Sequence, residues 1–372
     1  MKQEEIKRSQ GKGSIVFEKY TKKYFFENIS NQEIKQIYEK GFNLPLRIQW
    51  RITRMCNLNC KHCYLKEKNR KNDELSKQEI IKIAKKIVKS KIFEVLITGG
   101  EPTIKEEIVE VLEILGKSCS LTIFTNALDK NSLKKILPVL KKYKKNIRIN
   151  VSLDGPEKIH DSIRGKGTFK KTFENIKMLS DKGIEVIINT VLTKNLQPHL
   201  SHFIEDVRYS GVEAIQFSKF YPLGEGKNHP NLMLSPLEFK EILKKLMLIS
   251  EKILNPRIVF DHTFCFLLGE EKSEIKTRKC SGGVSKMVIE SNGDIYSCQL
   301  LPLPEFKMGN ILKKSIKEAW DSKNRLKFVE DFFPEECKNC SMNKYCTSGC
   351  KATSYSIHKT FKHKDPYCFH GR

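Results

Sequence analysis

The sequence predicts an α/β fold: a partial (β/α)6 TIM-like barrel followed by a small cysteine-rich domain. Short β-branched apolar runs alternate six times with longer segments that carry an apolar residue every three or four positions. Beyond residue 255 this alternation stops and cysteine-rich loops take over. Six strand–helix units imply parallel strands, and right-handed crossovers curl such a sheet in one direction, so we expect an open barrel.

The expected strands are, in chain order, Arg47–Thr53, Phe93–Thr98, Leu121–Thr125, Ile147–Leu153, Ile184–Leu192 and Glu213–Ser218. The expected helices are Ser76–Ser90, Lys105–Lys117, Asn131–Tyr143, Thr168–Lys182, Pro198–Ser210 and Ser235–Leu254. Near the amino end the pattern favours a hairpin at Ser14–Phe26 and a short helix at Asn31–Tyr38. Later, Met287–Ser291 and Asp294–Cys298 predict a hairpin with a type I′ turn at Asn292-Gly293. We therefore divide the chain into an N-terminal extension (1–44), a barrel (45–255) and a C-terminal domain (256–372).

The length and the net charge limit the functions that the protein can have. The 372 residues can bury a large core, and the sequence has neither a signal peptide nor a run of about eighteen apolar residues, so we expect a cytoplasmic protein without a membrane partner. The net charge of +24 comes from scattered lysines, which favours solvated faces and argues against a nucleic-acid partner. A basic face also suits an acidic electron donor such as a flavodoxin or a ferredoxin.

Ten of the twelve cysteines fall into two groups, which indicates iron–sulfur chemistry. The first group has the spacing C-x3-C-x2-C, which can ligate three irons of a cubane and leave the fourth iron open to a ligand. The second group can hold further clusters, with structural zinc as the alternative. The first group is Cys56, Cys60 and Cys63; the second is Cys280, Cys298, Cys337, Cys340, Cys346, Cys350 and Cys368.

The segment from Cys56 to Cys63 resembles the signature of the radical S-adenosylmethionine (SAM) enzymes, and the later cysteines resemble a SPASM extension. The SPASM pattern is carried by Gly293 with Cys298, then C-x2-C-x5-C-x3-C from Cys337 to Cys350, and a final Cys368. The resemblance implies that the first group holds a [4Fe–4S] cluster that binds SAM, and that the second group holds two auxiliary [4Fe–4S] clusters. It implies one auxiliary cluster on Cys337, Cys340, Cys346 and Cys368, and three irons of the other on Cys280, Cys298 and Cys350. Two alternatives remain for the last iron of this second cluster: Cys265 is its ligand, or this iron stays open to a substrate.

The same resemblance assigns SAM contacts at the carboxyl ends of the strands. Gly99, Gly100 and Glu101 resemble the segment that binds the SAM amino group, and the alternative is a plain turn. Asn126, Ser152, Asp154 and Asn189 match residues that contact SAM or face the substrate, with Ser152 the best candidate for the SAM carboxylate. The alternatives are an Asx-turn for Asn126 and a helix cap for Asp154.

Two loops remain open to interpretation. Arg164 lies in a loop after the fourth strand, where it binds a carboxylate or pairs with Asp161. The segment Tyr221–Gly226 resembles the loop on the adenine side of SAM.

The resemblance implies an oxidoreductase that cleaves SAM reductively to a 5′-deoxyadenosyl radical, which abstracts hydrogen from a peptide or protein substrate. The modification would be a crosslink, an oxidation or an epimerisation, with the auxiliary clusters assisting; no catalytic side chain is assigned. Oxidation or decarboxylation of a small molecule such as a haem precursor is the alternative, followed by a non-catalytic iron–sulfur scaffold and an RNA-modifying enzyme. The N-terminal extension covers the barrel edge or is a truncated domain that binds a leader peptide.

Overall fold

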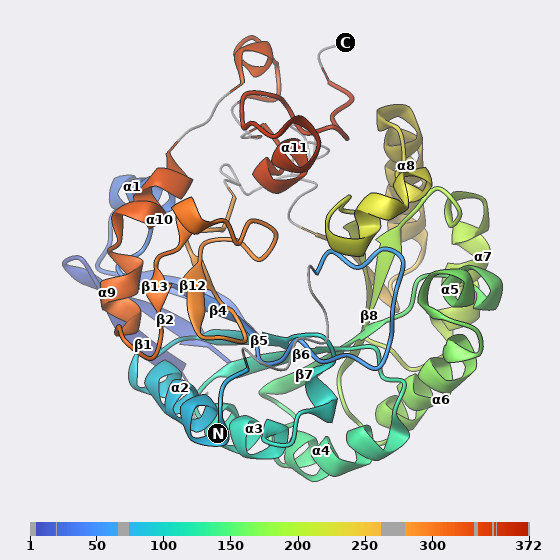
Figure 1. Cartoon of the computed structure of the whole chain (residues 1–372), viewed down its shortest axis with the longest axis horizontal. Helices are drawn as coiled ribbons and strands as arrows, with labels where there is room; N and C mark the ends of the chain where they lie inside the picture. Colours follow the sequence, from blue (N-terminus) through green and yellow to red (C-terminus); the bar gives the residue numbers. More distant parts are fainter. Residues whose placement is uncertain are drawn as a thin grey trace.

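The computed structural model describes residues 5–19, 21–65, 74–261, 280–330, 334–343, 346 and 348–370 (Figure 1). Its main feature is a sheet that is ten-stranded in these residues, with the order β10-β9-β8-β7-β6-β5-β4-β11-β12-β13. From β10 to β11 all neighbouring strands are parallel. The sheet curls into an open ring with its helices outside (Figure 1), so the predicted partial barrel is confirmed.

The six predicted strand–helix units are all present. Their strands are β4 (Arg47–Arg51), β5 (Glu94–Thr98), β6 (Ser120–Thr125), β7 (Ile147–Ser152), β8 (Val186–Leu192) and β9 (Ala214–Lys219). Their helices are α2 (Lys77–Lys89), α3 (Ile108–Gly116), α4 (Lys130–Lys142), α6 (Thr168–Asp181), α7 (Leu200–Arg208) and α8 (Pro236–Lys252). Helices α2 and α8 begin at capping boxes, Ser76 with Glu79 and Ser235 with Glu238, in which side chains satisfy the first free N–H groups.

The sheet extends beyond the six predicted strands at both sides. Strand β10 (Arg257–Phe260) continues it next to β9, and β11 (Lys286–Ile289) pairs in parallel with β4. The sheet therefore runs across the boundary that we drew at residue 255. Strand β10 is too short for its periodicity to be recognised in the sequence, whereas β11 overlaps the predicted strand Met287–Ser291, whose pairing with β4 was not expected.

The predicted hairpin that begins with β11 is present, but the predicted type of turn was wrong. Strand β11 pairs antiparallel with β12 (Asp294–Tyr296), which pairs with β13 (Gly309–Asn310). Only Gly293 of the Asn292-Gly293 pair has a positive φ, 82°, and the Gly293 N–H donates to Glu290 O at 2.9 Å. A type I′ turn needs a positive φ at both residues, so this is a longer loop that ends in a left-handed glycine.

The N-terminal residues form a small antiparallel sheet that covers the amino ends of β4 and β5. It contains β1 (Glu5–Gln10), β2 (Gly13–Glu18) and β3 (Lys23–Glu27), followed by α1 (Asn31–Lys40). The predicted hairpin is β2 with β3, whereas the mostly polar β1 was missed. Ile15 and Phe17 pack with Phe93, just before β5, and Tyr24 Oη donates to Glu94 Oε2 at 2.5 Å. This packing supports the interpretation that the extension covers the barrel edge.

After β13 the chain forms α9 (Ile316–Trp320), α10 (Lys323–Val329) and α11 (Lys351–His358). Helix α9 lies beside the N-terminal part (Figure 1), where Trp320 Nε1 donates to Phe42 O at 2.6 Å. One further helix, α5 (Glu157–Arg164), lies between β7 and α6. This segment was expected to be a loop, but Arg164 is the last residue of a helix.

Candidate metal and cofactor sites

The loop after β4 carries Cys56, Cys60 and Cys63, and it is fixed by the segment after β5. Gly100 N donates to Thr53 O and Glu101 N to Met55 O, each at 2.8 Å. A Cβ atom on Gly100 would lie 2.1 Å from Met55 O, so only glycine permits this approach. The Gly99-Gly100-Glu101 segment therefore determines where the cysteine loop begins.

The Glu101 side chain is buried and its acceptors are used within the protein. Oε1 accepts from Thr103 N at 3.1 Å and from the Thr103 and Thr125 hydroxyls at 2.7 Å, and Oε2 accepts from Asn126 N at 2.7 Å. Burial raises the pKa of Glu101, and these hydrogen bonds oppose the rise. The carboxylate thus ties the end of β5 to the end of β6 through hydrogen bonds within the protein.

A buried ion network lies behind the cysteine loop. Asp154 Oδ2 accepts from Arg164 Nε at 2.5 Å and lies 2.9 Å from His62 Nε2, and Arg164 Nη1 lies 3.7 Å from Cys60 Sγ. Burial alone would raise the pKa of Asp154, but Arg164 and His62 outweigh it and hold this pKa well below its usual range. The network connects the carboxyl end of β7 to the loop that holds the first three cysteines.

Two alternatives from the sequence are wrong here. Arg164 pairs with Asp154 and not with Asp161, whose carboxylate accepts from Gly167 N at 2.5 Å and Phe169 N at 2.8 Å. Asp154 does not cap α5, because the cap residue is Pro156 and no side chain bonds there. Closeness in the sequence suggested both the Arg164–Asp161 pair and the Asp154 cap, but the helical turn of α5 directs the Arg164 side chain back toward β7.

The remaining predicted SAM contacts lie at the carboxyl ends of β6, β7 and β8. Asn126 forms the Asx-turn that was the alternative to a SAM contact, because its Oδ1 accepts from Leu128 N at 2.9 Å, and its Nδ2 donates to Asn57 Oδ1 at 2.8 Å. Asn189 Oδ1 accepts from the Ser218 hydroxyl at 2.9 Å. Ser152 pairs in register with Asn189, and its hydroxyl makes no hydrogen bond to any residue that the structure describes.

The Tyr221–Gly226 loop packs on the chain that follows Cys63. Glu225 N donates to Cys63 O at 2.9 Å, and a Cβ atom on Gly224 would lie 2.5 Å from Leu65 O. Gly224 also has a positive φ of 56°. The loop after β9 therefore closes over the same cysteine loop that the segment after β5 fixes.

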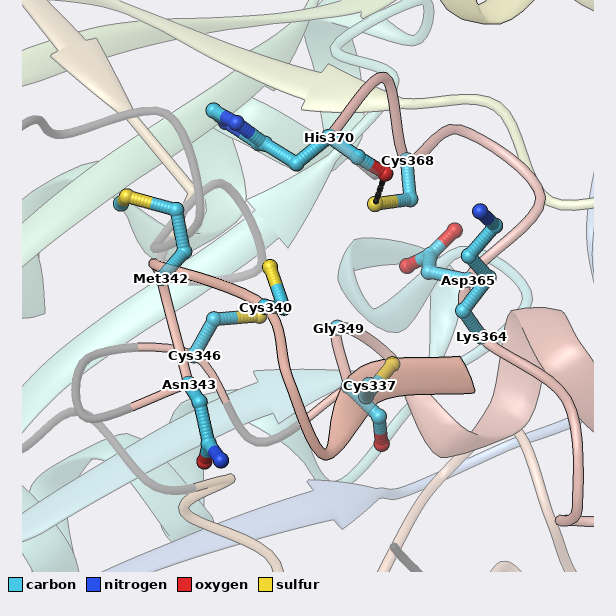
Figure 2. A pocket seen from close by; sticks show the side chains of 11 residues that line it. Cys337, Cys340, Met342, Asn343, Cys346, Gly349, Lys364, Asp365, Cys368 and His370 are labelled. Carbon is cyan, nitrogen blue, oxygen red and sulfur yellow. Dashed lines mark hydrogen bonds between the residues drawn. The ribbon is translucent and has the colours of Figure 1, made fainter. Parts of the chain in front are cut away.

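Four C-terminal cysteines surround one cavity (Figure 2). Burial, followed by the nearby Cys368, Glu336 and Cys340, raises the pKa of Cys337 to about 11. Buried thiols resist ionisation until a metal binds their sulfur atoms, so this donor set suits a metal cluster. The four are Cys337, Cys340, Cys346 and Cys368.

The other three C-terminal cysteines form a second group. Burial, with smaller contributions from the nearby Cys280 and Cys350, raises the pKa of Cys298 to about 12, so the three thiols lie close enough to influence one another. Cys298 and Cys350 also belong to one apolar cluster with Leu300 and Leu301. The fold thus separates the seven cysteines into a set of four and a set of three.

The fit to iron–sulfur clusters rests on this donor chemistry. No group of three His, Cys, Asp or Glu side chains among the described residues already stands as a metal site. Cys265, the candidate for a fourth ligand, lies outside the described residues. Cys119, expected to be a small buried hydrophobe, is fully buried, and burial raises its pKa to about 12.

Sequence reasoning missed two buried ion pairs close to these cysteines. Arg51 pairs with Glu290, and Lys219 pairs with Asp365. Each pair joins residues more than 140 positions apart, so no spacing rule could find them. One available signal was the position of Lys219 and Asp365: the first ends a barrel strand and the second precedes Cys368 by three residues.

Comparisons with known proteins agree with this geometry. Residues 50–207 match the model of the Radical SAM superfamily, and residues 280–341 match the SPASM model, an iron–sulfur cluster-binding domain. The chain is 27% identical over 347 residues to the antilisterial bacteriocin subtilosin biosynthesis protein AlbA of Bacillus subtilis, covering 88% of this chain and 74% of AlbA. It is 25% identical over 358 residues to the AdoMet-dependent heme synthase of Methanosarcina barkeri, covering 88% and 97%.

Among solved structures, Streptococcus suis SuiB bound to the precursor peptide SuiA superposes with a TM-score of 0.79 over 98% of each chain. The identity is 17%, so this likeness concerns the fold. None of the described helices combines the length and the apolar composition that a membrane span requires.

Proposed function

The chain belongs to the radical SAM superfamily and carries a C-terminal SPASM domain, and we propose that it modifies a peptide or protein substrate by hydrogen abstraction. The observation that carries the proposal is the separation of the later cysteines into a set of four and a set of three, beyond a barrel that holds C-x3-C-x2-C at its carboxyl end. Relatives that make or mature peptides support the substrate class.

In this proposal each cysteine group has one task. Cys56, Cys60 and Cys63 hold the SAM-binding [4Fe–4S] cluster, and the sets of four and three hold two auxiliary [4Fe–4S] clusters. When bound, the first cluster supplies the electron that cleaves SAM, giving the 5′-deoxyadenosyl radical that abstracts hydrogen. Arg164 and Asp154 orient the cysteine loop from behind, and the loops after β5 and β9 hold it from either side.

The polar residues at the strand ends are proposed to hold SAM: the backbone of Gly99, Gly100 and Glu101, with Asn126, Ser152, Asp154 and Asn189. Since Glu101 and Asp154 are engaged by internal partners, their contribution is to shape the site. Among the described residues, the Ser152 hydroxyl has no hydrogen-bond partner, which supports it as the donor to the SAM carboxylate. The Tyr221–Gly226 loop is proposed to lie on the adenine side.

Replacing Ser152 with alanine should weaken SAM binding about tenfold, the value of one hydrogen bond to a charged group at about 1.4 kcal/mol. Equilibrium dialysis of the reconstituted protein against labelled SAM measures this change. Ser250→Ala is the matched control, because its hydroxyl bonds only Met247 O on the outer helix α8. An unchanged affinity in Ser152→Ala would remove Ser152 from the SAM site.

A haem precursor is the second candidate substrate, because the heme synthase relative is matched over 97% of its length. The two candidates differ in their product. Peptide crosslinking or oxidation removes two mass units from the peptide, epimerisation in D2O adds one deuterium, and decarboxylation of a tetrapyrrole releases CO2. We further propose a flavodoxin or ferredoxin as electron donor and the cytoplasm as the site of action.

The first test is an iron and sulfide count on anaerobically reconstituted protein. About twelve of each per chain are expected for three cubanes, together with release of 5′-deoxyadenosine when dithionite and SAM are added. A short peptide encoded beside the gene, added as substrate, should then show one of the mass changes above. About four irons with zinc present would contradict the auxiliary clusters, and twelve irons without 5′-deoxyadenosine would indicate a scaffold.

A further inference from the structure

A lysine is completely buried where the barrel meets the cysteine-rich part. Lys219 is the last residue of β9, and its ammonium group pairs with the carboxylate of Asp365. Both side chains are 0% exposed. Tyr221 and Tyr367 lie 5.8 and 5.3 Å from the ammonium, measured to the ring centroids. A buried charge is costly unless it is paired, so this lysine depends on Asp365.

Asp365 in turn is bonded to the backbone around both C-terminal cysteine sets. Its Oδ2 accepts from Cys350 N at 2.8 Å, and its carbonyl accepts from Cys368 N at 2.8 Å. It also lines the cavity of the set of four (Figure 2). A Cβ atom on Gly349 would lie 2.4 Å from Asp365 Cβ, so the chain before Cys350 is built around this carboxylate. Asp365 thus contacts one ligand of each proposed auxiliary cluster.

The pair brings two opposite charges next to the second cysteine set. The Asp365 carboxylate, which accepts from Cys350 N, also pairs with the buried Lys219 ammonium. Charges interact strongly where water is excluded. A positive charge beside an iron–sulfur cluster favours its reduced, more negative state, and charge is one of the factors that set cluster potentials.

We propose that Lys219 and Asp365 are positioning residues that set the reduction potential of the auxiliary cluster on Cys280, Cys298 and Cys350. Lys219 raises this potential and Asp365 lowers it, and the pair joins both auxiliary sites to the carboxyl end of β9. The inference rests on the proposed auxiliary clusters.

The test is a redox titration of the reconstituted protein with dithionite, followed by electron paramagnetic resonance. The auxiliary signals are those that SAM does not alter. Lys219→Met should make the one-electron reduction of one auxiliary cluster at least tenfold less favourable, 59 mV. Asp365→Asn should shift the same potential upward. Lys219→Arg keeps the positive charge. Its reduction potential should therefore differ from the wild-type potential by less than half of the shift that Lys219→Met causes.

Opposite signs distinguish charge from structure, because a merely structural pair would give shifts of one sign or lose iron in both variants. The double variant Lys219→Met/Asp365→Asn leaves no unpaired charge and should lie between the single variants. Glu94→Gln is the control, since it alters an ion pair at the amino end of β5 in which the carboxylate is buried and its partner Arg47 is partly exposed. Shifts of one sign, no shift, or loss of iron with either variant would overturn the inference. A wild-type count of about four irons would instead overturn the proposed clusters themselves.

Discussion

Replacing Cys60 with alanine should abolish the release of 5′-deoxyadenosine and lower the iron content by about four per chain. Cys60 is buried at 6% exposure, and Arg164 Nη1 lies 3.7 Å from its sulfur, so this thiol has a fixed place in the loop. Losses on removing an outer contact of a metal site are about 10–100-fold, and loss of a ligand itself should exceed them. Iron analysis and chromatographic detection of 5′-deoxyadenosine measure the two effects.

The matched control is Cys119→Ala. Cys119 is fully buried between α3 and β6 and belongs to the hydrophobic core, so this change should retain both iron and SAM cleavage. Its expected cost is on the order of 1 kcal/mol of stability, because one buried heavy atom is lost. SAM cleavage that survives in Cys60→Ala would remove the first cysteine group from the chemistry.

Replacing Arg164 with methionine should give the largest loss of stability among single substitutions near the first cysteine group. The change leaves Asp154, which is 0% exposed, without its main cation. Breaking a buried ion pair costs about 3–5 kcal/mol. At about 2.1 cal/mol/K of unfolding entropy per residue, this corresponds to about 4–6 °C in Tm for a chain of this length. Anaerobic thermal unfolding followed by circular dichroism measures it.

The loss in Arg164→Met should also depend on pH. In the wild type the pKa of Asp154 is lowered, so its contribution is present above the unfolded value of about 3.9 and is lost only as pH falls below it. Without the arginine, burial raises this pKa, and the folded variant gains a proton and stability as pH falls. The Tm difference from wild type should therefore shrink between pH 8 and pH 5.

The control for Arg164→Met is Lys166→Met, which removes an exposed cation two residues beyond the end of α5. Its Tm should stay within about 1 °C of wild type, since surface substitutions change stability by about 0.5 kcal/mol or less. A Tm deficit in Arg164→Met that is equal at pH 5 and pH 8 would show that the lost packing, and not the unpaired Asp154, causes it.

Much of the barrel could be predicted because its signals are local. Each strand–helix unit repeats a switch from β-branched runs to helical spacing, and Ser76 and Ser235 mark helix starts with their own capping boxes. The short strand β10 was missed because four residues carry almost no pattern, and β11 was expected as a hairpin strand but not as the parallel neighbour of β4. They form only because β9 and β4 already offer free edges to pair with.

The family and its cofactors follow from the sequence alone, because thiolate spacing within a short loop is a local property that needs no knowledge of the fold. The partners of buried charges do not follow from it. Arg164 pairs with Asp154 instead of Asp161, and Lys219 pairs with Asp365, which is 146 positions away in the sequence. A charge that is removed from water must pair with whichever opposite charge the packing brings close to it. Only the tertiary structure decides which strand ends, loops and helices come together around each cysteine set.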